Sequence, residues 1–311
     1  MPFEQAAIIG TGMMGPGIAL TLALGGVRAR ILSRNAESAG AGLAKAHSQL
    51  MLLAGAGLAT PEQAVFARET LTSGTDVEAS ARSVDLIVES APEDMAFKQD
   101  LFAQLDRWAK PTAILATNTS GLSVTRIAEK CAHPERIMTA HFWNPPHLMP
   151  LVEIVRGERT DPARAEELRV LLTKCGKAVV MVKKDRPGQL GNRLQMALWR
   201  EAVYCAQEGI AEVEDIDTAA KLGFGLRLPV YGMFEHADIV GLELASAVMS
   251  NAVSDLYNEP KPPPLINTKV AAGQTGASAG QGFYDWSAKD ATAVKARRDA
   301  FVLDFLKRWR H

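Results

Sequence analysis

The sequence is poor in cysteine and carries almost no net charge. Its 311 residues include 34 basic and 35 acidic residues, which leave a formal charge of −1. The three cysteines, Cys131, Cys175 and Cys205, are widely spaced and odd in number. They form neither a disulfide framework nor a zinc pattern, so we expect a cytoplasmic protein with no bound metal. The balanced charge argues against nucleic acid and membranes as partners.

Charge is also missing from a long stretch near the N-terminus, residues 6–27. A stretch of this length and polarity could cross a membrane or act as an export signal. It contains six glycines and a proline, however, and it lacks the basic start and small-residue cleavage site of an export signal. We therefore predict that this segment folds within a globular domain.

In the first half of the chain, short apolar runs alternate with amphipathic stretches such as residues 97–108. This alternation is typical of parallel strands joined by crossover helices. Strands are expected at residues 6–10, 27–33, 84–90, 113–117, 136–142, 151–155 and 178–182. Continuous apolar runs such as VDLIVES and AILATN indicate strands that are buried on both faces.

A glycine motif follows the first expected strand. Gly10, Gly12 and Gly15 form G-x-G-x-x-G at the start of a helical run. Gly10 permits the tight turn, Gly12 lets the backbone approach a pyrophosphate, and Gly15 permits close helix–strand packing. The motif therefore predicts a dinucleotide site at the helix N-terminus. We count Met13 and Met14 among the cofactor-binding positions, although the pair would also serve to fill the core beside the loop.

The end of the second expected strand bears on the choice of dinucleotide. NAD sites usually have an acidic residue here that binds the ribose 2′-hydroxyl, whereas this chain has Ser33 followed by Arg34. Without the carboxylate a 2′-phosphate is not repelled, and the guanidinium is able to pair with it, which favours NADP over NAD. In the alternative interpretation Arg34 stacks on the adenine and the cofactor is NAD.

The composition changes at Lys183–Gly188, where charge, proline and glycine replace the apolar pattern. The chain after this point is mainly helical in pattern, with a long helix expected at residues 189–207 and a charged one at 289–310. We predict an α/β fold, in which a Rossmann-type, doubly wound, mostly parallel sheet is followed by a smaller all-helical domain. The NAD(P)-binding domain is placed at residues 1–184 and the substrate and dimerisation domain at 185–311.

Polar residues stand where the expected strands end, and this is the edge at which doubly wound sheets bind ligands. His141 and Asn144 follow one strand, and Ser120 follows another. Glu153 lies within an apolar strand, where a carboxylate is costly unless it has a partner. A nearby imidazole would supply that partner, and a His–Glu pair is how a neutral general base is oriented.

Six motifs resemble those of the 3-hydroxyacyl-CoA dehydrogenase family. They are the glycine loop, TNTSG (117–121), HFWNPPHLMPLVEIV (141–155), KDRPGQLGNRL (184–194), EDIDTAAKLG (214–223) and GQGFYDW (280–286). They cover essentially the whole chain in the family's order. The resemblance implies an NAD(P)-dependent oxidoreductase that acts on a CH–OH group, a place in fatty acid metabolism, and a homodimer that pairs through the helical domain.

The resemblance also implies roles for single residues. His141 is the general base that takes the hydroxyl proton, and Glu153 orients it. Ser120 hydrogen-bonds the reacting oxygen and Asn192 reaches the substrate, although Ser120 would also serve as a helix N-cap and Asn192 as a surface residue. The positions that match contacts to the ribose and nicotinamide end of the cofactor are Glu93, Lys98 and Asn144.

The chain departs from the acyl-CoA members in two places. Residues 36–71 offer little positive charge beyond Lys45 and Arg68 for the phosphates of coenzyme A. The stretch GFGLRLPVYGMFEH (223–236) more closely resembles the branch that acts on free acids, which includes L-gulonate 3-dehydrogenase, carnitine dehydrogenase and a pyridine-carboxylate dehydrogenase. There Arg227 would pair with a substrate carboxylate.

Two substrates and two functions therefore remain open. The substrate is either a free 3-hydroxy carboxylate, which we favour, or a 3-hydroxyacyl-CoA. The alternative function is a catalytically silent structural or binding protein on the same scaffold, as crystallins are. The presence of all four expected catalytic residues favours the enzyme.

Overall fold

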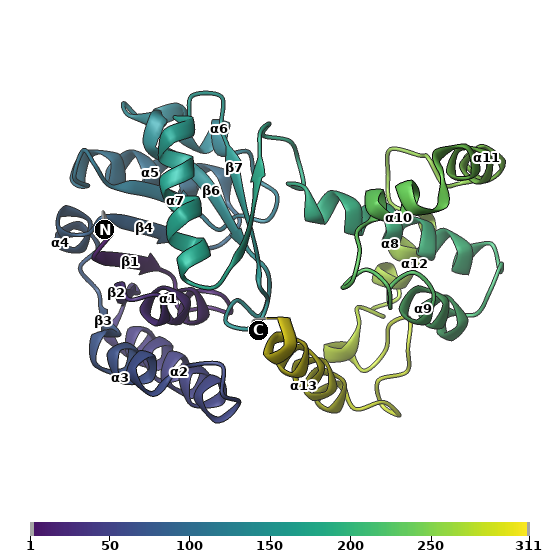
Figure 1. Cartoon of the computed structure of the whole chain (residues 1–311), viewed down its shortest axis with the longest axis horizontal. Helices are drawn as coiled ribbons and strands as arrows, with labels where there is room; N and C mark the ends of the chain where they lie inside the picture. The colour runs from purple at the N-terminus through teal and green to yellow at the C-terminus, as the bar shows by residue number, and fades with distance from the viewer. Residues whose placement is uncertain (1–2, 310–311) are drawn as a thin grey trace. The chain divides into compact units, whose positions relative to one another are not determined.

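The computed structural model describes residues 3–309, which divide into two compact units (Figure 1). One unit contains the chain up to Arg193 together with the segment from Arg297, and the other is Leu194–Ala296. A division into domains between residues 184 and 185 stays a proposal. The expected terminal helix includes Arg310, which lies outside the described residues.

The first unit is built on a single eight-stranded sheet of order β3-β2-β1-β4-β5-β6-β7-β8. Neighbouring strands from β3 to β6 are parallel, β7 is antiparallel to β6, and β8 is parallel to β7. The strands are β1 Gln5–Ile9, β2 Arg28–Leu32, β3 Thr72–Gly74, β4 Leu86–Glu89, β5 Ile114–Thr117, β6 Ile137–Phe142, β7 Leu151–Arg156 and β8 Ala178–Val182. The predicted doubly wound, mostly parallel sheet is confirmed.

Helices cover both faces of this sheet (Figure 1). One buried cluster packs α1 Gly15–Leu24, α2 Ala36–Gly55, α3 Pro61–Thr70 and α7 Pro162–Lys174 against the strands. The other packs α4 Val77–Ser83, α5 Met95–Trp108 and α6 Val124–Ile127. The two clusters take alternate residues of the central strands, because successive side chains of a strand point to opposite faces. The expectation that these strands are buried on both faces is therefore correct.

Helix α1 explains the uncharged stretch near the N-terminus. Nine of its ten residues are buried, from Gly15 to Ala23, because the helix lies between β1 and the helices α2 and α3. Within residues 3–309 no helix is long and apolar enough to cross a bilayer.

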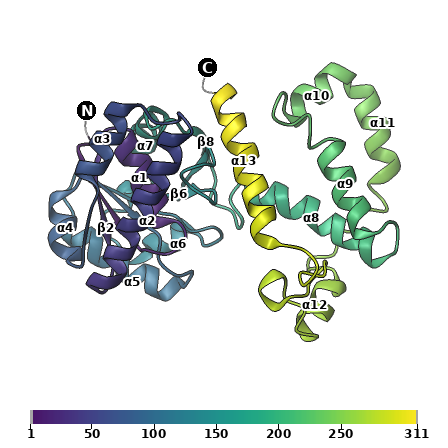
Figure 2. The same cartoon turned by 90° about the horizontal axis from the view of Figure 1, so that it is seen from below.

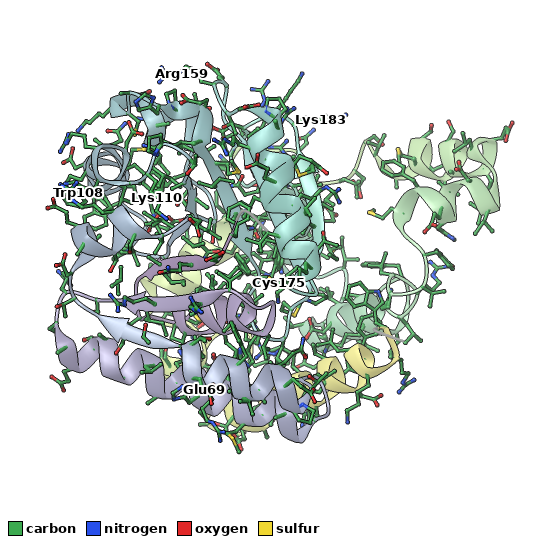
Figure 3. All side chains as sticks on the ribbon, turned by 60° about the vertical axis from the view of Figure 1, so that its left-hand side comes forward. Glu69, Trp108, Lys110, Arg159, Cys175 and Lys183 are labelled. Atoms are coloured by element: carbon green, nitrogen blue, oxygen red, sulfur yellow. The ribbon has the colours of Figure 1, made fainter. Side chains whose placement is uncertain are left out.

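Local capping determines where several helices begin. The side chain of Asn35 accepts a hydrogen bond from the backbone N–H of Ser38 at the start of α2. The side chain of Asp94 does the same for Phe97 at the start of α5. Such caps satisfy backbone donors that have no partner within the helix. Helix α5 ends at Trp108, close to Lys110 and to the beginning of β5 (Figure 3).

The second unit is helical (Figure 2). Helix α8 Gly191–Gln207 begins in the first unit, and α13 Ala291–Trp309 returns to it. The helices between them are α9 Val213–Leu222, α10 Met233–Val240, α11 Leu242–Ala252 and α12 Pro264–Ala271. Short 3₁₀ turns occur at Ala128–Lys130, Pro134–Arg136 and Ala277–Ala279. The predicted all-helical C-terminal domain is confirmed.

Candidate active site

His141 and Glu153 face each other across the antiparallel strands β6 and β7, where they are direct partners in the register. The His141 Nδ1 atom lies 2.8 Å from Glu153 Oε2. Both side chains are enclosed, with 6% and 0% of their surface exposed. Because Nδ1 is engaged with the carboxylate, it carries the ring proton of the neutral imidazole, and Nε2 is left as the acceptor.

Glu153 accepts hydrogen bonds from four groups. Besides His141, the indole Nε1–H of Trp143 donates to Oε2 at 3.0 Å. The backbone N–H groups of Leu190 and Gly191 donate to Oε1 at 2.9 and 2.7 Å. Burial alone would raise the pKa of Glu153, but these hydrogen bonds, with that of His141 the largest, lower the pKa to about 2. The carboxylate is therefore ionised throughout the physiological range.

A second group of polar residues joins the ends of β4 and β5. Glu93 Oε1 accepts from the backbone N–H of Ser120 and from the Thr119 hydroxyl, both at 2.7 Å. Asn192 donates its side-chain N–H to the Ser120 carbonyl at 3.1 Å. Three of the predicted site residues are thus in contact, and the Ser120 side chain is left exposed for a ligand.

Lys98 is completely buried rather than open to a ligand. Its ammonium group lies 2.5 Å from Glu89 Oε1, and the two side chains are 1% and 0% exposed. The other oxygen of Glu89 accepts from the Thr117 hydroxyl at 2.6 Å, and Lys98 also lies 3.6 Å from Glu93. Lys98 therefore also pairs with Glu93, and Glu89 is a residue to which no role was assigned from the sequence. The signal was a carboxylate at the end of the apolar run VDLIVES.

The three glycines of the loop differ in what surrounds them. A Cβ at Gly10 would lie 2.3 Å from the Ser90 carbonyl oxygen, and one at Gly15 would lie 1.9 Å from the Gly10 carbonyl oxygen. At Gly12, by contrast, an added Cβ would meet no atom of residues 3–309 within 4 Å. The two outer glycines are required by packing, and Gly12 leaves its backbone open to a ligand.

The start of α1 adds donors to this opening. Met14 stands at the N-cap, and none of the described side chains caps the helix, so its first N–H groups are available to an anion. The pair Met13 and Met14 does not behave as one unit. Met14 packs against the core, but Met13 is 63% exposed, so core filling was the wrong interpretation for Met13.

Ser33 and Arg34 follow β2 at the same edge of the sheet. The Gly10 N–H bonds to the Leu32 carbonyl, which precedes Ser33, and the Ser33 N–H bonds to the Gly74 carbonyl. Arg34 is exposed and forms no ion pair with any other residue in 3–309. The guanidinium group is therefore free to meet an anion beside the glycine loop.

Asn144 is exposed on the turn that follows β6, and its peptide bond to Pro145 is cis. The neighbouring strand end is held by Asn118, whose side-chain oxygen accepts from the Phe142 N–H at 2.8 Å. No role was assigned to Asn118 from the sequence. It links the end of β5 to the end of β6 and so positions the turn that carries Asn144.

Arg227 belongs to the second unit, on the segment between α9 and α10. It lines an open groove of about 1280 Å³ together with apolar side chains such as Met196, Leu222 and Leu226. Its role towards a substrate of the His141 site stays a prediction.

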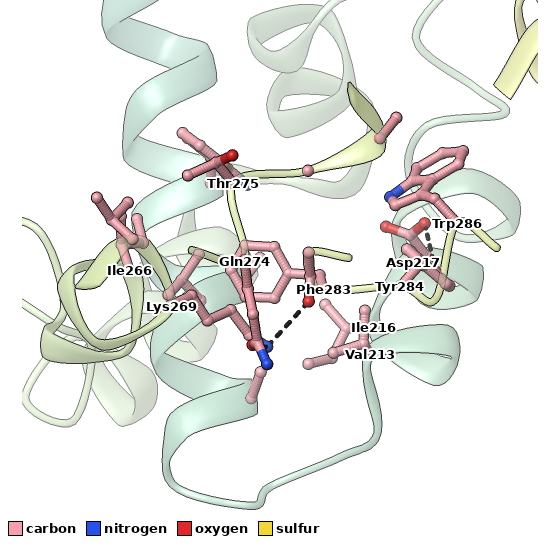
Figure 4. Close-up of a pocket in the computed structure, with 18 residues that line it drawn as sticks. Val213, Ile216, Asp217, Ile266, Lys269, Gln274, Thr275, Phe283, Tyr284 and Trp286 are labelled. Atoms are coloured by element: carbon pink, nitrogen blue, oxygen red, sulfur yellow. Dashed lines mark hydrogen bonds between the residues drawn. The ribbon is translucent and has the colours of Figure 1, made fainter. Parts of the chain in front are cut away.

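A separate cavity of about 490 Å³ lies in the second unit and is mostly apolar (Figure 4). The Tyr284 hydroxyl donates to Asp217 at 2.9 Å across its wall, and Lys269 donates to the Gly282 carbonyl at 3.0 Å. Tyr284 and Asp217 come from the motifs GQGFYDW and EDIDTAAKLG, so these two motifs hold each other in place. Across residues 3–309 no group of three or more His, Cys, Asp or Glu is arranged to hold a metal.

A mostly parallel, doubly wound sheet with a glycine loop between β1 and α1 defines a Rossmann-type dinucleotide-binding protein. The model described as "3-hydroxyacyl-CoA dehydrogenase, NAD binding domain" matches residues 5–186, and that of the C-terminal domain of the same family matches residues 188–286. The chain belongs to the 3-hydroxyacyl-CoA dehydrogenase family.

Named relatives agree with this family. The chain is 33% identical over 299 residues to 5-formyl-3-hydroxy-2-methylpyridine 4-carboxylate 5-dehydrogenase of Mesorhizobium japonicum, which covers 95% of this chain and 94% of that protein. It is 34% identical over 284 residues to 3-hydroxybutyryl-CoA dehydrogenase of Bradyrhizobium diazoefficiens, covering 91% and 95%. A crystal structure of the pyridine-carboxylate dehydrogenase, described as an NAD+-dependent dismutase, aligns over 97% of both chains with a TM-score of 0.90 and 31% identity.

These findings confirm the family resemblance and the class of oxidoreductases acting on CH–OH groups. They support NAD as the coenzyme of the family.

Proposed function

We propose that the chain is a dehydrogenase that acts on the 3-hydroxyl group of a 3-hydroxy acid or its thioester, with His141 as the general base. The observation that carries this proposal is the enclosed His141–Glu153 pair at the carboxyl edge of the sheet, with a distance of 2.8 Å and no hydrogen bond to Nε2 from any residue in 3–309. When bound, the nicotinamide supplies the acceptor for the hydride of the alcohol carbon. His141 Nε2 takes the hydroxyl proton, and Glu153 stabilises the imidazolium that results.

Ser120 acts on the reacting oxygen, and Asn192 acts on the substrate. The Ser120 backbone N–H is held by Glu93, which leaves its exposed hydroxyl to donate to that oxygen. Asn192 is fixed by its bond to the Ser120 carbonyl, so its side chain is held beside Ser120. The glycine loop residues Gly10, Gly12 and Gly15 hold the pyrophosphate of the coenzyme.

The test replaces His141 by glutamine and the exposed His133 in the same way as a control. We expect His141→Gln to lower kcat by roughly 10²–10⁴-fold, because proton transfer by a positioned base contributes about that factor. His133→Gln should leave kcat unchanged. Turnover of 3-hydroxy acids and acyl-CoAs is followed by nicotinamide absorbance. A His141→Gln enzyme that keeps activity within a few-fold of the parent would refute the proposed base.

The coenzyme that we propose is NADP. Support comes from the exposed, unpaired Arg34 beside the glycine loop and from the absence of an acidic residue after β2. Arg34→Ala should weaken the binding of NADP by roughly ten- to a hundredfold and leave the binding of NAD nearly unchanged, because a charge-assisted hydrogen bond to the 2′-phosphate is lost. Equal weakening of both coenzymes would indicate that Arg34 stacks on the adenine and that NAD is used.

The substrate that we propose is a free 3-hydroxy carboxylate rather than a CoA thioester. Of the two basic residues noted in 36–71, Lys45 already donates to the Gly12 carbonyl at 3.3 Å, so little positive charge is free for coenzyme A. The relative named as a pyridine-carboxylate dehydrogenase is named for a free acid. Arg227→Ala should raise KM strongly for a free acid and hardly change it for a thioester. Unchanged turnover of every acid tested would exclude Arg227 as the carboxylate partner.

We also propose that the second unit carries a homodimer interface. None of the described residues of α10 and α11 is buried. The large apolar side chains exposed between residues 222 and 256 are Leu222, Phe224, Leu226, Leu228, Val230, Met233, Phe234, Ile239, Val240, Leu242, Leu244, Val248, Met249, Val253 and Leu256. An apolar surface of this extent is characteristic of an association site, and a second copy is the most common partner.

A further inference from the structure

Among residues 3–309, Trp143 is the one tryptophan whose indole N–H donates to the carboxylate of the His141–Glu153 pair. Its Nε1–H donates to Glu153 Oε2 at 3.0 Å, and the same oxygen lies 2.8 Å from His141 Nδ1. The indole and imidazole rings are close, with centroids 5.8 Å apart and planes inclined by 52°. Trp143 and His141 are therefore neighbours both through space and through the carboxylate.

The position of the indole ring is determined by packing as well as by this hydrogen bond. Trp143 follows directly after β6, and its ring lies against Gly191 at the start of α8. A Cβ at Gly191 would lie 2.5 Å from Trp143 Cζ2, so the close approach depends on glycine. The Gly191 N–H in turn donates to the other oxygen of Glu153 at 2.7 Å. Both oxygens of the carboxylate therefore accept hydrogen bonds from residues, Trp143 and Gly191, that also lie against each other.

We propose that Trp143 is a positioning residue for His141, which acts through Glu153 by limiting how strongly the carboxylate attracts a proton on the imidazole. The proposal rests on the proposed role of His141 as the base. A base that takes the hydroxyl proton during alcohol oxidation must be neutral before the reaction. An unshared carboxylate favours the imidazolium and would leave less of the enzyme in the neutral form.

His141 and Trp143 share Oε2 of Glu153, and this sharing balances the neutral form of the imidazole against its charged form. Two donors on one oxygen each receive part of its charge, so the attraction felt by the Nδ1–H is weaker than it would be from an oxygen with a single donor. The two backbone donors on Oε1 keep the group ionised and fixed in direction. Trp143 is thereby distinguished from Leu190 and Gly191, because it competes with His141 for the same atom.

The test uses Trp143→Phe, which keeps an aromatic ring against Gly191 but removes the N–H. Trp108→Phe is the matched control, since Trp108 packs against a core cluster at the far end of α5, where the strands begin rather than end. Two quantities are measured for each protein. One is the pH dependence of kcat/KM for alcohol oxidation, and the other is the titration of the His141 imidazole by ¹⁵N NMR.

We expect Trp143→Phe to move the acidic limb of kcat/KM and the imidazole titration upwards together by roughly 0.5–1 pH unit, as loss of one hydrogen bond to a charged group implies. Trp108→Phe should move neither. In a Glu153→Gln background Trp143→Phe should produce no further shift, because the charge on which it acts is gone.

The outcomes separate this inference from the proposed function. If the imidazole titration of Trp143→Phe matches that of the parent, or if the shift persists in the Glu153→Gln background, Trp143 has only a packing role and the inference is overturned. If the imidazole titration moves but the acidic limb of kcat/KM does not, Trp143 acts on His141 as inferred, and it is the assignment of His141 as the base that fails.

Discussion

Two buried carboxylates organise the polar side chains at the carboxyl edge of the sheet. Glu89 and Glu153 are both 0% exposed, and each is surrounded by donors. Glu89 faces the ammonium of Lys98, whereas Glu153 faces the imidazole of His141. A buried charge without a partner costs several kcal/mol, so neither acid tolerates loss of its partner. The two pairs differ in what they leave for a ligand. The Lys98 ammonium is enclosed with Glu89 and is not open to a substrate, whereas no residue in 3–309 bonds to His141 Nε2.

His147 provides a prediction at the same scale. Burial, followed by the nearby Lys177, lowers the pKa of His147 to about 4. In the unfolded chain an ordinary histidine titrates near pH 6.5, so between about pH 6.5 and 4 the unfolded state binds the proton first. The free energy of unfolding should therefore fall as the pH decreases through this window. Glu153 contributes in a lower window, between about pH 4.5 and 2.

The measurement is urea unfolding at pH 7 and pH 5. His147→Gln should lose less stability between these two pH values than the parent does, because the group that takes up the proton on unfolding has been removed. The exposed His133→Gln serves as the control and should behave like the parent. Equal losses in the parent and in His147→Gln would show that His147 is accessible to protons in the folded state.

At the scale of elements, the turn from β1 to α1 combines two requirements that different glycines meet. Gly15 sits at a point of contact, where its neighbour is the backbone of Gly10 itself. At Gly12 an added Cβ would meet no atom of residues 3–309 within 4 Å. We therefore expect stability and the proposed coenzyme binding to be separable within one motif of six residues.

Two alanine substitutions test this separation. Gly15→Ala should lower the free energy of unfolding by about 1–3 kcal/mol, because a methyl group is forced against a backbone carbonyl within a packed helix. Gly12→Ala should leave the free energy of unfolding nearly unchanged but weaken binding of the dinucleotide by roughly tenfold or more, since the methyl group would occupy the space proposed for the pyrophosphate. Urea unfolding and fluorescence titration measure the two effects. A stable Gly15→Ala protein would contradict the packing argument.

The whole chain joins a unit with an extensive buried core to one with few buried side chains. The first unit contains both core clusters. In the second unit, the buried hydrophobic side chains among the described residues are those of Val203 and Tyr257. A helical unit with so little core is expected to gain stability by association.

Phe234 offers the test at this scale, because its side chain is 88% exposed on α10. We expect the parent to sediment as a dimer and Phe234→Glu to shift towards the monomer, since a charge would be buried in the apolar interface. The control is Met51→Glu, at a residue that is 71% exposed on α2 of the first unit. A monomeric parent, or a dimer unaffected by Phe234→Glu, would exclude α10 as the interface.

Much of the fold could be predicted from the sequence, because apolar runs and turn residues are local signals. All seven expected strands are present, with ends that differ by at most two residues. The strand that was missed, β3, has the sequence TSG and no apolar run, so only its pairing with β2 makes it a strand. The reversal at β7 was not predictable from LVEIV, since the composition of a strand does not indicate its direction.

The candidate site shows the same limit. His141 and Glu153 were recognisable by type and position, but Trp143 and Glu89 were not selected. Glu89 ends an apolar run, yet the residues around Trp143 and Glu89 in the sequence do not identify the group that each contacts. Trp143 is ten residues from Glu153 and Glu89 is nine from Lys98. Such distances in sequence are bridged only once the strands and helices have packed.

The sequence by itself determined the alternation of strands and helices, the glycine loop and the residue types from which a site can be made, because each of these depends on short-range periodicity or on a single backbone requirement. Only the tertiary structure showed which groups share each buried carboxylate: Lys98 and Thr117 at Glu89, and Trp143, Leu190 and Gly191 beside His141 at Glu153. This arrangement depends on strand order, on the antiparallel register of β6 and β7 and on the start of α8, and these follow from the packing of elements far apart in the chain.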